Sequence, residues 1–219
     1  MKNTNTSIVL ADDHRIVIEG LHALLNAEPD FDIIGKTGDG LKTLDLVNKL
    51  NPDVLVLDLM MPGINGLEVA RQLNKQNPDT KIIVLSMYDD EGFVLEALSN
   101  GVAGYVLKDE GSTELIHAIR EVNQGHRYLS PSLADRAIEI YEQMNKAGTT
   151  DKYETLTTRE REVFHLSAEG QTNNEIAKRL GISVRTAETH RSNLMNKLDI
   201  HNQADLTRYA IRRGIISVD

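Results

Sequence analysis

The 219-residue sequence contains no cysteine and no tryptophan. The absence of cysteine excludes disulfides, thiolate metal sites, cysteine nucleophiles and iron–sulfur clusters, and it is consistent with a reducing compartment. Aromatic residues make up only 4% of the chain, which argues against an aromatic platform that stacks single-stranded nucleic acid or sugars. The N-terminus has no apolar signal core, and no run approaches the roughly 18 apolar residues of a membrane span. We therefore expect a cytoplasmic protein with no membrane partner.

The formal net charge is −9, but the acidic excess is unevenly distributed. Residues 1–130 carry 11 Lys and Arg against 20 Asp and Glu, whereas residues 151–219 carry 11 against 10. The charge of the whole chain argues against a nucleic-acid binder. A nearly neutral second half with clustered Arg and Lys can still bind phosphates locally.

The first half alternates short apolar runs with helical patterns. We expect strands at 7–11, 32–36, 54–58, 81–86 and 104–107, separated by helices at 16–26, 41–50, 67–75, 92–99 and 113–123. Several of the strand runs are continuously apolar, as is typical of strands covered on both faces. Five such units with short connections predict an α/β fold with a doubly wound five-stranded parallel sheet.

The second half has a purely helical pattern with many helix-start signals. Thr157 with Glu160, and Thr172 with Glu175, fit the capping box. The pattern predicts four short helices, at 158–169, 173–180, 183–198 and 203–213. The close turn between the second and third of these is typical of a helix-turn-helix.

A connecting segment separates the two halves. It begins Ser-Pro, a good helix start, and apolar residues then recur at helical spacing over 131–146. Residues 146–154 are small and polar, which favours a flexible linker. We therefore predict three parts: a domain at 1–127, a linker with a helix at 128–154, and an all-α four-helix domain at 155–219.

Polar residues gather where the predicted strands end: Asp12, Asp13, Asp58, Ser86 and Lys108. In an open α/β sheet these carboxyl ends share one edge, where function collects. Three neighbouring carboxylates repel one another unless a cation lies among them, and oxygen ligands with room for water suit Mg²⁺.

This set of groups suits phosphoryl transfer. The Asp58 carboxylate, at the end of the central strand, is a candidate nucleophile, and Lys108 and Ser86 could bind oxygens of the phosphoryl group. Taken singly, each residue has a simpler interpretation. An Asp after a strand often caps a helix, a Ser forms a turn, and a Lys is a solvated surface charge.

Residues 7–125 resemble a response-regulator receiver domain. The resemblance lies in DD after the first strand, VLVLDLMMPGINGLE around Asp58, LS before Met87, and GYVLKD around Lys108. It implies a flavodoxin-like fold in which Asp58 accepts a phosphoryl group from a sensor histidine kinase. It also implies that Asp12, Asp13, Asp58 and the backbone carbonyl of Met60 bind Mg²⁺. Lys108 then senses the phosphate, and Ser86 and Tyr105 are the switch residues.

The second domain is similar to the LuxR-type helix-turn-helix of the NarL/FixJ response regulators. The similarity lies in LTTREREV, TNNEIAKRLGIS and VRTAETHRSNLMNKL. It implies a transcription regulator that binds double-stranded promoter DNA as a homodimer, formed when the receiver is phosphorylated. In such a protein the only catalysis is its own aspartyl phosphorylation and slow self-dephosphorylation, so it is not an enzyme in the usual sense.

The third helix of this domain supplies most of the expected DNA contacts. Arg185, Thr186, Arg191 and Lys197 can reach phosphates, which fix the register of binding without reading sequence. By family position Glu188, Thr189 and Ser192 face the base edges, although some members carry lysines at the first and third of these. His190 has two interpretations, a DNA contact or a packed boundary histidine. Asn174 on the preceding helix completes the predicted set.

Two other functions compete with this one, and the sequence disfavours both. An Mg²⁺-dependent phosphohydrolase with an Asp nucleophile would carry a second Asp as general acid two residues on, where this chain has Met60. A small-ligand sensor would need an enclosed apolar pocket, which an acidic sheet edge does not indicate.

Overall fold

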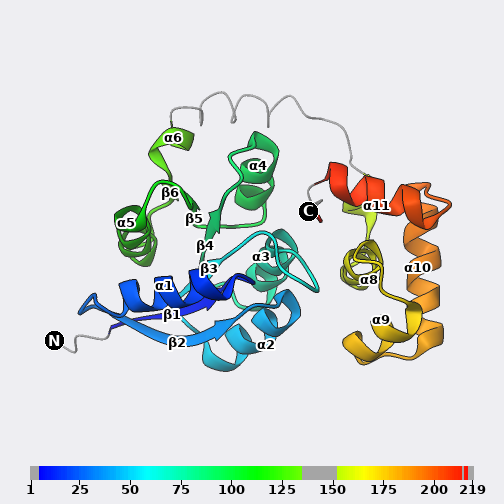
Figure 1. The fold of residues 1–219 in the computed structure, drawn as a ribbon, viewed down its shortest axis with the longest axis horizontal. Helices are drawn as coiled ribbons and strands as arrows, with labels where there is room; N and C mark the ends of the chain where they lie inside the picture. The colour runs from blue at the N-terminus through cyan, green and yellow to red at the C-terminus, as the bar shows by residue number, and fades with distance from the viewer. Residues whose placement is uncertain (1–4, 135–151, 214, 217–219) are drawn as a thin grey trace. The chain divides into compact units, whose positions relative to one another are not determined.

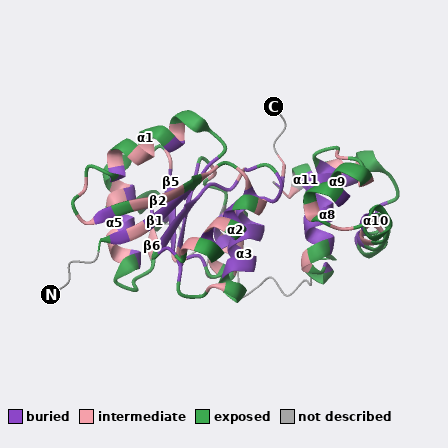
Figure 2. Ribbon diagram, turned by 90° about the horizontal axis from the view of Figure 1, so that it is seen from below, coloured by how far each residue is buried: buried purple, intermediate pink, exposed green. Residues whose placement is uncertain are grey.

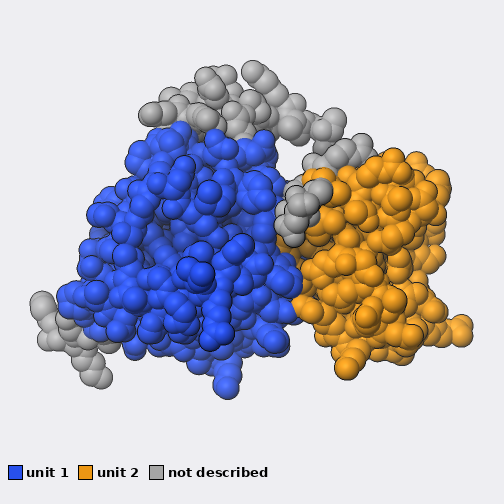
Figure 3. All heavy atoms as spheres, viewed as in Figure 1, with its two compact units in different colours: residues 1–62, 66–147 blue, residues 63–65, 148–219 orange. Residues whose placement is uncertain are grey.

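The chain divides into two compact units, formed largely by residues 1–147 and 148–219 (Figure 3). The computed structural model describes residues 5–134, 152–213 and 215–216. Most of the predicted helix at 131–146 and most of the predicted linker lie outside these residues. Within the described ranges, no helix combines the length and apolar character needed to cross a membrane.

The first unit is a parallel sheet with the strand order β2-β1-β3-β4-β5-β6 (Figure 1). Its strands are β1 Thr6–Ala11, β2 Phe31–Thr37, β3 Val54–Leu57, β4 Lys81–Ser86, β5 Gly104–Leu107 and β6 Tyr128–Leu129. The helices between them are α1 Arg15–Leu25, α2 Gly40–Leu50, α3 Gly66–Gln76, α4 Glu91–Ser99 and α5 Ser112–Asn123, and α6 Pro131–Ala134 follows β6. This arrangement confirms the predicted doubly wound parallel sheet.

The expected number of strands, five, was one too few. Tyr128 and Leu129 pair in parallel with Gly104 and Tyr105 and add a sixth strand at the edge of the sheet. A strand of two residues is too short to show a periodic apolar pattern in the sequence. It is identified only by its pairing with β5 in the structure.

Helices cover both faces of the sheet (Figure 2). Side chains of α1 and α5 pack on one face against alternate strand residues such as Ile8, Val56 and Ile83. The intervening strand residues, such as Val9, Leu55 and Val84, are equally buried. Burial on both faces accounts for the continuously apolar strand sequences.

The second unit contains η1 Lys152–Thr155, a 3₁₀ helix, and α8 Thr158–Ala168, α9 Asn173–Leu180, α10 Val184–Leu198 and α11 Gln203–Arg212. Both predicted capping boxes are present, at Thr157 and Thr172. Tyr153 of η1, inside the segment predicted as linker, belongs to the apolar core of this unit. A single aromatic residue in a polar run gives no periodic pattern, so sequence analysis could not place it in the core.

Candidate functional site

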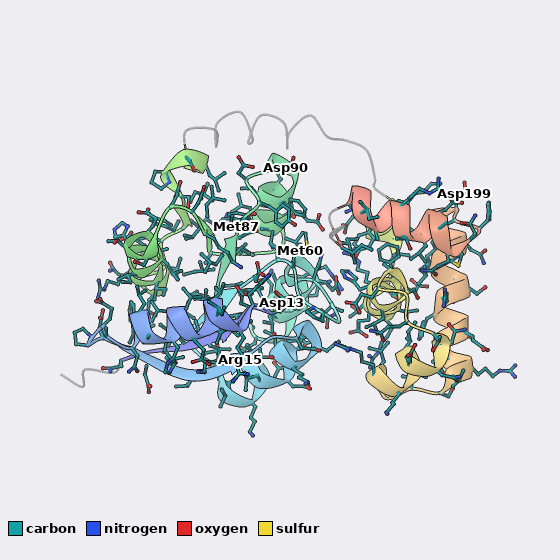
Figure 4. All side chains as sticks on the ribbon, viewed as in Figure 1. Asp13, Arg15, Met60, Met87, Asp90 and Asp199 are labelled. Atoms are coloured by element: carbon teal, nitrogen blue, oxygen red, sulfur yellow. The ribbon has the colours of Figure 1, made fainter. Side chains whose placement is uncertain are left out.

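Four residues at the carboxyl edge of the sheet bring metal-binding atoms together. Ligand atoms of Asp12, Asp13, His14 and Asp58 all lie within 4.8 Å of one another. Asp12 and Asp13 follow β1, and Asp58 follows β3, the strand hydrogen-bonded to β1. Figure 4 shows Asp13 and Met60 on this same side of the sheet. The structure therefore assembles the predicted acidic residues at one position.

Asp58 is almost completely buried, with 5% of its surface exposed. Its Oδ1 accepts a 2.9 Å hydrogen bond from the N–H of Leu59, which fixes the orientation of the carboxylate. Burial raises the pKa of Asp58 to about 6, an effect opposed by the charge of Lys108 and reinforced by that of Asp12. A cation that binds beside such a buried carboxylate stabilises its ionised form and lowers its pKa.

Lys108 follows β5 and supplies a positive charge to this cluster. Its Nζ lies 2.6 Å from Asp12 Oδ2 and 3.3 Å from Asp58 Oδ2. Burial lowers the pKa of Lys108, but the hydrogen bond from its ammonium to Asp12 and the charges of both carboxylates outweigh this and raise it. The ammonium is therefore held within reach of any group attached to Asp58.

His14 is a member of the cluster that sequence reasoning missed. Its Nδ1 lies 2.8 Å from Asp13 Oδ1, and its backbone N–H donates a 2.8 Å bond to Asp12 Oδ1. Its position directly after the two aspartates was the available signal. The His14 side chain is exposed, whereas Asp12 is buried.

Ser86 and Tyr105, the predicted switch residues, are both fully buried and share a partner in Tyr88. Ser86 Oγ accepts a 3.1 Å bond from the Tyr88 N–H, and the Tyr105 hydroxyl donates a 2.6 Å bond to the Tyr88 carbonyl. Burial raises the pKa of Tyr105 well above its ordinary value, so the hydroxyl stays protonated and can donate. These bonds tie the loop after β4 to β5.

The third helix of the second unit, α10, has one buried side and one exposed side. Ala187, Leu194 and Leu198 are buried, and His190 is half-buried. The exposed side carries five predicted DNA-contact residues, Arg185, Thr186, Glu188, Thr189 and Ser192. Asn174 is exposed on α9. A surface with these side chains can enter a groove of duplex DNA.

Two of the predicted phosphate contacts, Arg191 and Lys197, have side-chain partners on other helices of the unit. The hydroxyl of a third, Thr186, forms a 2.7 Å hydrogen bond with the hydroxyl of the helix-capping Ser183. Arg191 donates hydrogen bonds to Asn173 and Gln203, and Lys197 lies 2.6 Å from Glu160 Oε2 and 3.2 Å from the Thr155 carbonyl oxygen. Helical spacing predicts the side of the helix on which a residue lies. It does not predict which groups on neighbouring helices a long side chain will contact.

Lys178 is an exposed basic residue in the last turn of α9 that sequence reasoning did not include. In helix-turn-helix proteins the helix before the recognition helix crosses the DNA backbone. The Lys178-Arg179 pair just before the helix-ending Gly181 was the signal that could have identified it.

Comparisons with known proteins agree with this two-part organisation. The family described as "Response regulator receiver domain" matches residues 8–120, and "Bacterial regulatory proteins, luxR family" matches residues 154–210. The oxygen regulatory protein NreC of Staphylococcus carnosus is 37% identical over 215 residues, which cover 95% of this chain and 98% of NreC.

Solved structures with both parts are also similar. The Salmonella typhimurium RcsB response regulator is 29% identical with a TM-score of 0.58, over 94% of this chain and 98% of RcsB. A complex of RcsB with DNA has the same identity, coverage and TM-score. A shorter solved chain, from a LuxR-family two-component response regulator of Aurantimonas, is 32% identical with a TM-score of 0.60; the match covers 99% of that chain but only 65% of this one. These matches favour neither a phosphohydrolase nor a small-ligand sensor.

Proposed function

Because the chain belongs to the two-component response regulators that join a receiver domain to a LuxR-type DNA-binding domain, we propose that phosphorylation of Asp58 controls its binding to promoter DNA. The observation that supports this most strongly is the convergence of Asp12, Asp13, Asp58 and Lys108 at one edge of the sheet. A sensor histidine kinase is the proposed phosphodonor.

In this reaction an Asp58 carboxylate oxygen attacks the phosphorus of a phosphohistidine. The bond from phosphorus to the imidazole nitrogen breaks, and its electron pair leaves with the imidazole. Oδ2 is the better candidate for the attacking oxygen, because Oδ1 accepts the Leu59 N–H. The Lys108 ammonium, 3.3 Å from Oδ2, is positioned to bind an oxygen of the transferred group.

The carboxylates fit an Mg²⁺ ion. Asp12, Asp13 and Asp58 offer the hard oxygen ligands that Mg²⁺ prefers, and the exposed Asp13 leaves the site open to water and to a phosphodonor. We propose that these three residues and the Met60 backbone carbonyl hold the ion. When bound, Mg²⁺ would neutralise charge on the phosphoryl group.

Ser86 and Tyr105 are the proposed link to the rest of the receiver. A phosphoryl group on Asp58 offers new acceptors to the Ser86 hydroxyl, which at present accepts the Tyr88 N–H. Any movement of Ser86 disturbs Tyr88, and through it the Tyr105 hydroxyl. Phosphorylation would thereby shift a pre-existing equilibrium between two receiver states, one of which favours a homodimer.

The exposed side of α10 is the proposed surface for double-stranded DNA. RcsB, whose chain is similar throughout, has been solved in complex with DNA. The second half of this chain has nearly balanced charge, so binding by one copy would be weak, and a dimer on two half-sites is expected.

The phosphorylation step is tested by incubating the full chain with Mg²⁺ and acetyl phosphate and measuring its intact mass. We expect one phosphoryl adduct on the wild type and none on Asp58→Asn. Asp45→Asn, which changes an exposed aspartate on α2, is the matched control and should retain the adduct. An adduct of equal yield on Asp58→Asn would show that the acceptor lies elsewhere.

A further inference from the structure

Arg191 of α10 connects three other helices of the DNA-binding domain. Its Nη1 donates a 3.1 Å bond to Oδ1 of Asn173, the first residue of α9, and its Nη2 donates a 2.6 Å bond to Oε1 of Gln203, the first residue of α11. Gln203 Nε2 in turn donates a 2.6 Å bond to the Ser167 carbonyl in the last turn of α8. The side chain is half-buried between these partners.

The chemistry of these partners fixes their orientations. A guanidinium group only donates hydrogen bonds and a carbonyl oxygen only accepts them, so the Gln203 amide satisfies both neighbours in one orientation and neither when flipped. The same argument places Oδ1 of Asn173 toward Arg191. The planar fork of the guanidinium suits two partners at once, which a lysine ammonium on a flexible stem does not reproduce.

This network lies next to the surface proposed to contact DNA. Thr189 and Ser192, which flank Arg191 closely in sequence, are both exposed on α10. From these contacts we infer that Arg191 is a positioning residue: it sets the orientation of α10 relative to α9 and α11, and DNA affinity depends on it through that orientation and not through a phosphate contact. The inference rests on the proposed DNA-binding function.

The test uses the full chain treated with beryllofluoride and a 30-base-pair duplex that the wild type enriches from a random pool. Binding is measured by fluorescence anisotropy at several salt concentrations, against this duplex and a scrambled one. The variants are Arg191→Gln, Arg191→Lys, Gln203→Leu and the double variant Arg191→Gln with Gln203→Leu. Arg185→Gln is the matched control, because the exposed Arg185 side chain makes no hydrogen bond or ion pair with any described residue.

A positioning role predicts that each single variant, Arg191→Lys included, loses affinity for the enriched duplex by about five- to tenfold. The double variant should lose little more, because both substitutions break one network. Affinity for the scrambled duplex and the salt slope should stay near wild type, whereas Arg185→Gln should lower both affinities and reduce the slope by about 1.

Other results would overturn the inference. Equal loss on both duplexes with a reduced salt slope for Arg191→Gln, together with wild-type behaviour of Arg191→Lys and Gln203→Leu, would make Arg191 a phosphate contact. Circular dichroism checks that each variant is folded. If Arg191→Gln does not fold, the comparison of Gln203→Leu with the wild type tests the inference. Failure of the wild type to enrich any duplex is a separate result, which would overturn the proposed function itself.

Discussion

Lys108 forms a closer ion pair with Asp12 than with Asp58, at 2.6 Å against 3.3 Å. The predicted acceptor is therefore the less well neutralised of the two buried carboxylates bound to Lys108, in keeping with its raised pKa of about 6. An acceptor held in this way is costly to ionise, and a cation that binds beside it decreases this cost. Three of the predictions below follow from this edge of the sheet.

The first prediction concerns the stability of the protein without divalent ions. Asp58 has a pKa of about 6 in the folded chain against an ordinary value of 3.8, so the folded state binds more protons between these values. The contribution of Asp58 to the free energy of unfolding should therefore fall as the pH rises from about 4 to 6, and the difference between the wild type and a variant at Asp58 isolates it. Asp58→Asn removes this penalty and should stabilise the protein at pH 7 by about 1–3 kcal/mol.

Urea unfolding in EDTA across this pH range measures the effect. Asp45→Asn is the control for loss of one exposed negative charge. If Asp58→Asn is no more stable than the wild type at pH 7, then Asp58 is not a buried carboxylate whose ionisation destabilises the folded protein.

The second prediction concerns Mg²⁺. If the ion binds the folded site, its addition should raise the midpoint of thermal unfolding. The stabilisation should reach about 2.7 kcal/mol at a concentration one hundred times the dissociation constant. Asp13→Asn should remove most of this shift, because Asp13 supplies one ligand and its exposed side chain can be replaced without disturbing the core. A shift of wild-type size in Asp13→Asn, measured by differential scanning fluorimetry, would argue against the site.

The third prediction concerns the proposed switch. Tyr105→Phe removes the hydroxyl that donates to the Tyr88 carbonyl and should lower the free energy of unfolding by about 1 kcal/mol. The yield of the phosphoryl adduct should not change, whereas the gain in DNA affinity on treatment with beryllofluoride should be smaller. Tyr128→Phe is the matched control, since its hydroxyl faces His117 on α5. A full gain in Tyr105→Phe would exclude the hydroxyl from signal transmission.

The fourth prediction separates two lysines of the DNA-binding domain. Lys197 pairs with Glu160, so Lys197→Gln should lower the free energy of unfolding by about 1 kcal/mol and leave the salt dependence of DNA binding unchanged. Lys178 is exposed and has no ion pair with the residues that the structure describes. Lys178→Gln should leave stability unchanged and reduce the salt slope by about 1. The opposite pattern would identify Lys197, and not Lys178, as the phosphate contact.

Sequence periodicity predicted most of the fold because both units obey strong local rules. Continuous apolar runs marked the buried strands, and the capping residues Thr157 and Thr172 marked helix starts to within a residue. The two-residue strand β6 and the buried Tyr153 were not predicted. The position of each is set by contacts with other elements, and neither belongs to a periodic apolar pattern in the sequence.

The acidic site was predictable for a related reason. In a parallel sheet the residues that follow the strands must meet at one edge, so Asp12, Asp58 and Lys108 could be brought together from their positions alone. The partners of Arg191 and Lys197 were not predictable, because long side chains reach across helix interfaces whose geometry the sequence pattern does not specify.

The central claim is that chemistry at Asp58 controls DNA binding by the second domain. The most direct test is fluorescence anisotropy of the full chain with its enriched duplex, with and without beryllofluoride and Mg²⁺, for the wild type and Asp58→Asn. We predict at least a tenfold gain in affinity for the wild type, equivalent to about 1.4 kcal/mol, and no gain for Asp58→Asn. Equal affinity of the wild type in both conditions, or an equal gain in Asp58→Asn, would contradict the claim.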